Sequence, residues 1–250
     1  RWRTIVSGGG DIYADTDELN YLYGTATTGP IVDLGSTRLA AHPFVGGSVA
    51  GLEDDFYYAE ALAGVQFEGY LEGAYQMVRL RAGYRSYGED WVSSEGFWAD
   101  ASAKFSLADL IGTGDVLVFS PTVRWSGIDG GTAFAFSSGV CPFDCIESSP
   151  GRYWQAGAKL EYFRDLTDWL TVGGGVGFRQ TWYDEPLTII GSETDREDFL
   201  VSPTASVILH DLLAAQTDFK VDYRYDHNDS NDDERDYENH TVSAKVVTRF

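Results

Sequence analysis

The stretch His240-Thr-Val-Ser-Ala-Lys-Val-Val-Thr-Arg-Phe250 decides the fold class of this chain. Successive side chains of a β-strand point to opposite faces, so every second residue counted back from Phe250 shares one face. That face is largely apolar and includes Val246, whereas the other face carries Lys245 and Arg249. A strand of a closed barrel in a bilayer has to alternate in this way between lipid and water. The stretch therefore predicts the last strand of a membrane barrel.

The same period-two alternation repeats backwards through the chain, and it predicts an all-β transmembrane antiparallel up-and-down β-barrel as one domain over 1–250. Because a single-chain barrel of this kind has an even number of strands, we expect about 12, within a range of roughly 10–14. Before the terminal strand, the others are expected near 2–15, 18–27, 36–51, 55–69, 73–87, 95–107, 115–127, 152–163, 169–183, 198–210 and 217–227.

The connections between these strands alternate in length, which gives the barrel an orientation. Short periplasmic turns and longer external loops are typical of outer-membrane barrels. The compact set is 107–114, 164–168 and 211–216, and the longer set, rich in Gly, Ser or acidic residues, is 127–151, 184–197 and 228–238. The long set is therefore expected outside the cell.

Composition narrows the function classes. No segment reaches the roughly 18 apolar residues that a spanning helix needs, and no secretory leader is visible, so an exported protein would be in its mature form. The net charge of -21 argues against nucleic acid as a partner, since phosphates need a basic surface. The acidity fits external loops that meet divalent cations bridging lipopolysaccharide, or simple solubility or halophily.

Aromatic residues on the apolar faces predict two rings at the levels of the bilayer interfaces. A soluble β-sandwich or lipocalin-like barrel would instead point them inward and the charges outward. Those expected near the external loops are Tyr84, Phe97, Trp125, Trp154, Trp182 and Tyr225, and Phe250 is expected at the opposite interface.

The polar faces would line the lumen, which must be hydrated or laced with ion pairs because an unpaired charge inside a membrane protein is costly. The candidate lumen residues are Arg79, Arg81, Arg85, Arg124, Lys159, Arg179, Lys220, Arg224, Glu60, Glu68, Asp100, Glu161 and Asp222. The three arginines at 79, 81 and 85 form a basic ladder that either steers anionic solutes or is neutralised by Glu60 and Glu68. Both interpretations stay open.

Two further motifs contain side chains that are common in disulfides, metal sites or catalytic sites. Cys141 and Cys145 lie in a Gly/Ser-rich loop, and in an exported protein they favour a local disulfide over a metal or redox site. His227 follows Asp226, but adjacent strand residues face opposite ways and no serine in an elbow-like setting accompanies a histidine. We therefore expect no enzymatic activity, no cofactor and no bound metal.

The segment from Tyr223 to Val242, leading into Phe250, resembles the closing hairpin of certain outer-membrane barrels. It has a Tyr-x-Tyr strand, an Asn-Asp-Ser-Asn loop and a Tyr-x-x-His-x-Val strand. Such hairpins close the putative porins of surface-polysaccharide systems and the barrel domain of surface lipoprotein assembly modifiers. The resemblance implies a Gram-negative outer-membrane barrel.

These features together predict a porin-like channel for small hydrophilic solutes in the bacterial outer membrane, with anions among them if the basic ladder is not neutralised. The alternative is a structural or secretion barrel of an outer-membrane complex without its own open pore. Expected partners are outer-membrane lipid, lipopolysaccharide and, through the C-terminal strand, the barrel-assembly machinery.

Overall fold

The computed structural model describes residues 1–11, 21–35, 38–52, 55–71, 74–88, 95–128, 152–184, 195–211, 217–232 and 236–248. They form a 13-stranded antiparallel sheet in which twelve strands follow one path, each beside its neighbour in sequence, while the two-residue β3 pairs with β4 off this path. The strands are β1 (Trp2–Asp11), β2 (Tyr21–Pro30), β3 (Val32–Asp33), β4 (Leu39–Leu52), β5 (Asp55–Leu71), β6 (Ala74–Tyr87), β7 (Glu95–Ala108), β8 (Asp115–Ser126), β9 (Tyr153–Thr167), β10 (Leu170–Tyr183), β11 (Glu197–Leu209), β12 (Thr217–Ser230) and β13 (Tyr237–Thr248).

The predicted all-β, up-and-down architecture with about twelve strands is confirmed. The predicted turn at 164–168 is wrong for most of its length, because β9 continues to Thr167 and Asp165 still pairs with Thr171. The predicted loop at 228–238 is also too long, since β12 reaches Ser230 and β13 starts at Tyr237. The stretch 164–168 has a single apolar residue, Leu166, and 228–230 has none, so alternation gives little signal there although the backbone ladder continues.

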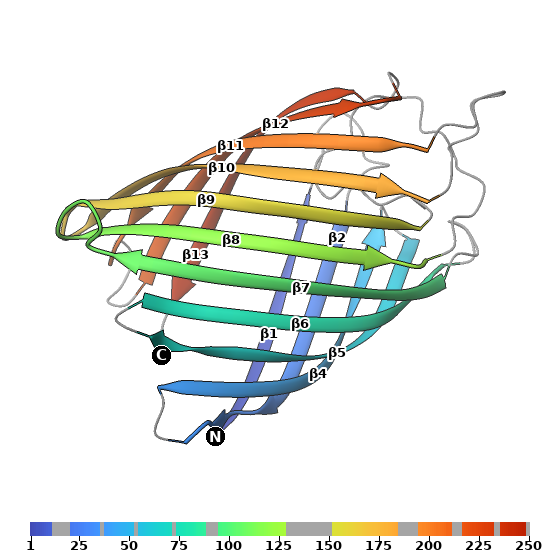
Figure 1. Cartoon of the computed structure of the whole chain (residues 1–250), viewed down its shortest axis with the longest axis horizontal. Helices are drawn as coiled ribbons and strands as arrows, with labels where there is room; N and C mark the ends of the chain where they lie inside the picture. The colour runs from blue at the N-terminus through green and yellow to red at the C-terminus, as the bar shows by residue number, and fades with distance from the viewer. Residues whose placement is uncertain are drawn as a thin grey trace.

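The sheet curls, and its concave side is the inner face of the molecule. In Figure 1, β1, β2 and β13 pass behind the wall that β5 to β11 form. Contacts that skip strands lie on this inner face: Arg3 of β1 pairs with Glu68 of β5, and Lys220 of β12 lies 5.7 Å from the Phe163 ring of β9. No ladder joins β1 to β13 within the described ranges, so closure of the barrel stays a prediction.

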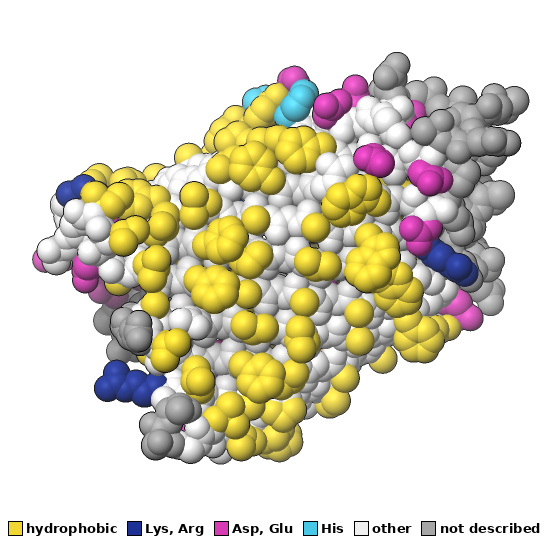
Figure 2. All heavy atoms as spheres, viewed as in Figure 1, with side chains coloured by type: hydrophobic (Ala, Val, Ile, Leu, Met, Phe, Trp, Pro, Cys, Tyr) yellow, Lys and Arg dark blue, Asp and Glu magenta, His cyan; other side chains and the backbone are white. Residues whose placement is uncertain are grey.

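The outer face is apolar and open to the surroundings. Figure 2 shows hydrophobic side chains spread across it, with the visible charges gathered toward the two ends of the strands. The exposed residues of this face include Val45, Val49, Leu80, Phe97, Phe119, Val123, Trp154, Leu160, Phe178, Phe199 and Val207. Among the described residues, no helix is long and apolar enough to span a membrane.

The hydrophobic core of the molecule is formed by side chains on the inner face. One buried cluster contains Phe44, Leu62, Trp98 and Ile128. The Trp98 ring lies over Gly83, where a Cβ atom would come within 2.8 Å of it. A glycine at this position thus leaves room for the indole to approach the wall closely.

Candidate functional site

The register places all the candidate lumen residues on the inner face, because directly paired residues of adjacent strands share a face. Arg81 lies opposite Asp100, and Asp100 lies opposite Arg124. Glu60 lies opposite Arg85. The strands β5 to β8 therefore carry a belt of alternating acids and bases across one wall.

The most buried ion pair of this belt joins Arg85 to Glu60. Their Nη2 and Oε2 atoms are 2.9 Å apart, and the two side chains are 14% and 5% exposed. The Arg85 guanidinium also lies 4.3 Å from the centre of the Tyr58 ring. Burial, an opposite charge and an aromatic face together hold this arginine in one place.

The neighbouring pair is bidentate. Arg81 donates from Nε to Oδ1 of Asp100 at 3.0 Å and from Nη2 to Oδ2 at 2.6 Å. Trp98 lies between two guanidinium groups, 5.5 Å from that of Arg81 and 5.4 Å from that of Arg124. A parallel fork of this kind fixes the orientation of the arginine as well as neutralising it.

Further pairs run along β9 and β12. Lys159 lies 2.9 Å from Glu161, Lys220 lies 2.8 Å from Asp222, and Arg224 lies 2.9 Å from Asp226. Asp226 was not among the candidates, although it continues the inner row of Asp218 and Asp222 in the sequence. Glu68 does not neutralise the basic ladder, as one hypothesis had it, but pairs with Arg3 of β1.

Arg79 differs from the other members of the ladder. Within the described part of the chain it forms no ion pair, and its buried Nε atom has no hydrogen-bond partner. Its register partner Ser102 also has a buried hydroxyl without a partner. Arg179 lies on the same face, opposite Gly157 of β9.

The predicted aromatic residues gather at the end of the strands away from the β7–β8 turn. Tyr84 and Phe97 pack edge-on at 5.0 Å, and Trp125 lies 6.5 Å from Trp154. Trp182 is the register partner of Trp154. Tyr225 of β12 contacts the His240 ring at 4.9 Å. The structure thus arranges these aromatics in a row across β6 to β10 and again at β12.

The opposite end, which we call the turn end, carries the β7–β8 and β9–β10 turns. Asp115 closes the first turn, accepting hydrogen bonds from the backbone amides of Leu110, Ile111 and Gly112 at 2.7–3.0 Å. Burial raises the pKa of Asp115, whereas these amides and the Tyr162 hydroxyl lower it, and the pKa lies below its usual value. The carboxylate therefore stays ionised and holds the turn.

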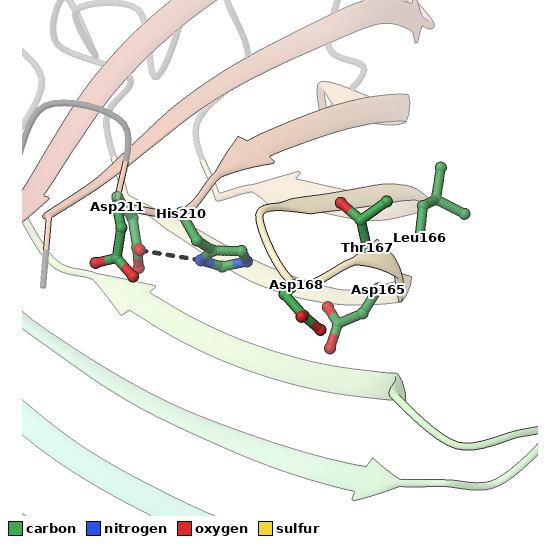
Figure 3. Close-up of a pocket in the computed structure, with 7 residues that line it drawn as sticks. Asp165, Leu166, Thr167, Asp168, His210 and Asp211 are labelled. Atoms are coloured by element: carbon green, nitrogen blue, oxygen red, sulfur yellow. Dashed lines mark hydrogen bonds and ion pairs between the residues drawn. The ribbon is translucent and has the colours of Figure 1, made fainter. Parts of the chain in front are cut away.

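A pocket of about 490 Å³ lies beside the β9–β10 turn, and sequence reasoning missed it. Figure 3 shows Asp165 and Asp168 on one side and His210 on the other, with Leu166 pointing away. The other lining residues are Thr167, Asp211 and Asp218. Among the described residues, no group of three or more His, Cys, Asp or Glu side chains has the arrangement of a metal site.

Several predicted residues lie outside the described ranges or are not brought together by the structure. Cys141, Cys145 and Phe250 lie outside the described ranges, so no observation supports the predicted disulfide, which stays a prediction. Asp226 is buried on the inner face, whereas His227 is half exposed and lies 3.6 Å from Glu238. The structure therefore does not form an Asp226–His227 pair.

Comparison with known proteins gives little further guidance. No family model matches the chain, and no curated protein does. A solved structure with a similar outline is OccK10 (OpdN) from Pseudomonas aeruginosa, at 10% sequence identity and a TM-score of 0.42, covering 99% of this chain and 74% of that one. At this level of similarity, function has to be argued from the residues of the chain itself. The resemblance to porins of surface-polysaccharide systems and to surface lipoprotein assembly modifiers stays a prediction.

Proposed function

We propose that the chain is a Gram-negative outer-membrane barrel whose lumen passes small hydrophilic solutes. The observation that carries this proposal is the division of the sheet into two faces. The outer face exposes large apolar side chains such as Phe97, Trp154 and Phe178, whereas the inner face holds ion pairs such as Arg81–Asp100. Water would penalise the first face and hydrocarbon the second, so the bilayer belongs outside and water inside.

The row of loop-end aromatics supports the same placement. Trp154 and Trp182 are exposed on the outer face, at one level near the ends of β9 and β10. Amphipathic aromatic rings favour the boundary between hydrocarbon and headgroups. Outer-membrane lipid and lipopolysaccharide are then the surroundings of the outer face, and the barrel-assembly machinery is the partner that inserts it.

We propose that the lumen favours anions, and that Arg79 is the residue that sets this preference. The five inner pairs on β5 to β12 compensate their own charges, whereas Arg79 has no ion-pair partner within the described ranges. A cation without a fixed counter-ion in a narrow hydrated passage attracts mobile anions.

A barrel without an open pore is the second candidate. The inner cluster of Phe44, Leu62, Trp98 and Ile128 and the contact between Lys220 and the Phe163 ring favour it, because both occupy interior space. In that case the chain would act as a structural or secretion component of an outer-membrane complex. No catalytic activity is proposed for either candidate.

Single-channel recording in planar bilayers separates the two candidates. We expect discrete openings of the purified chain and a reversal potential in a KCl gradient that indicates chloride preference. Arg79→Gln should shift the reversal potential toward that of a non-selective pore. Arg1→Gln, which removes the same charge from an exposed side chain at the turn end, should not. Silence at all voltages and salt concentrations would rule out the channel and leave the closed barrel.

Membrane residence has its own test. The native chain should be extracted from the outer-membrane fraction only with detergent, and its gel mobility should change on heating as the sheet unfolds. Recovery in the soluble fraction without detergent would contradict the proposal.

A further inference from the structure

The pocket at the turn end holds a relay of four polar side chains from four chain segments. Asp218 of β12 lies 3.0 Å from Nδ1 of His210, and Nε2 of His210 lies 2.8 Å from the hydroxyl oxygen of Thr171 in β10. That hydroxyl in turn donates to Asp165 of β9. Asp218 and Thr171 are 6% and 5% exposed, whereas the His210 side chain is 29% exposed and Asp165 is exposed, so the relay is buried at two members and reaches water at the other two.

The hydrogen atoms available to this relay decide how many of its contacts are hydrogen bonds. Ionised carboxylates bring none, the threonine hydroxyl brings one, and a neutral imidazole brings one. Two hydrogens cannot serve the three contacts Asp218–His210, His210–Thr171 and Thr171–Asp165. A protonated imidazole brings a second hydrogen, and all three contacts then become hydrogen bonds.

We propose that His210 is a pH-sensitive latch that fastens the β9–β10 turn to the end of β11 and the start of β12. When the imidazole is charged, the relay is complete from Asp165 to Asp218. When it is neutral, one of the three bonds is lost: Thr171–Asp165, His210–Thr171, or Asp218–His210, where the unprotonated Nδ1 then faces the carboxylate. Histidine is the side chain whose unperturbed charge change falls between pH 5 and 8, so that interval is where the latch is tested.

The surroundings of His210 suit one positive charge. Four carboxylates face the pocket: Asp165 from β9, Asp168 from the β9–β10 turn, Asp211 beside His210, and Asp218 from β12. Thr171 of β10 is uncharged, and no lysine or arginine is among the described residues that line the pocket.

The arrangement is not that of a hydrolase, although an acid, an imidazole and a hydroxyl are in line. The Thr171 hydroxyl is buried and already donates to Asp165, so it is not poised to attack a substrate. The backbone also ties the same segments, because the His210 amide donates to the Trp169 carbonyl at 2.9 Å. Neither its donor nor its acceptor titrates, so a change of protection with pH in these segments has to come from the relay of side chains.

Hydrogen exchange of the full chain in detergent tests the latch without reference to conduction. Protection factors, which are corrected for intrinsic exchange rates, are compared at pH 5.5 and pH 8 for the backbone amides of 165–171 and 208–211. In the wild type they should fall roughly tenfold at the higher pH, the equilibrium factor of one hydrogen bond to a charged group. His210→Gln should give low values at both pH values. His240→Gln, which alters an exposed histidine hydrogen-bonded to Tyr223, should keep the wild-type response.

Thr171 supplies a second pair of variants that leave His210 and Asp218 in place. Thr171→Val keeps the shape of the side chain but interrupts the relay, and it should abolish the pH response. Thr171→Ser keeps the hydroxyl and should retain the response. Wild-type protection that does not change with pH overturns the latch, and so does a response that survives in His210→Gln or in Thr171→Val.

Discussion

Removing Glu60 takes away the buried carboxylate 2.9 Å from the Arg85 guanidinium on the inner face, and this should be among the most damaging single changes to the wall of β5 to β8. The pair is 2.9 Å apart with side chains 14% and 5% exposed. Coulomb's law at that distance gives about 1.4 kcal/mol in bulk water and about 6 kcal/mol at an effective dielectric constant of 20. Because the pair is largely buried, its interaction energy lies between these two values.

Glu60→Gln should therefore lower the free energy of unfolding by about 3 kcal/mol, the range found when one partner of a buried pair is removed. The Tyr58 ring 4.3 Å from Arg85 recovers part of the loss, since an aromatic face attracts a cation. Glu60→Gln combined with Arg85→Gln removes both charges and should return to within about 1 kcal/mol of the wild type.

Urea titration of the detergent-solubilised chain measures these free energies, provided that the slopes stay equal among the variants. Glu161→Gln is the matched control, because its partner Lys159 is 41% exposed and an exposed pair contributes only about 0–1 kcal/mol. Equal losses for Glu60→Gln and Glu161→Gln, or a double variant no more stable than the single one, would refute the reasoning.

Two further predictions concern the turn end and the inner wall. Since the pKa of Asp115 is lowered in the folded state, its contribution to stability is present above its unfolded pKa and is lost as the pH falls through the lowered value. Asp115→Asn should remove that part of the acid dependence in melts recorded across the carboxylate range, and an unchanged acid limb would contradict it. Gly83→Ala would place a Cβ atom within 2.8 Å of both the Trp98 ring and the Ala61 carbonyl oxygen, and relieving these contacts should cost about 1–3 kcal/mol. Gly24→Ala, where an added Cβ atom meets nothing within 4 Å, is its control, and equal losses in the two variants would exclude a packing effect.

Strand number and the side-chain face could be predicted because alternation is a local property of the sequence. Phe97 and Trp98 show this, since a single step along β7 separates an exposed outer ring from a buried inner one. The alternation of apolar and polar residues is weak at the end of β9, where most residues of both faces are polar. It is also weak in β1, where glycines follow Ser7, and the pair between Arg3 and Glu68 was missed for that reason.

The pairing of particular charges was harder to predict than their face. Glu60 was expected to neutralise the basic ladder and does so through Arg85, but Glu68 pairs with a strand further along the sheet. The His210 pocket could not be predicted from the sequence. It depends on how far along the strand direction the β9–β10 turn and the end of β11 lie when they become neighbours. A register of this kind is set by the ladder between strands and not by any one stretch of sequence.

The neighbour-to-neighbour path of the sheet makes its width adjustable. Every strand on the path pairs with the strands before and after it, with none crossing over another. Excision of β9 and β10 would bring β8 beside β11 in the antiparallel direction, and only one new ladder would have to form. Duplication of a hairpin would work in the same way. The sheet could therefore gain or lose width in steps of two strands while the remaining ladders, and the two ends they present, keep their order.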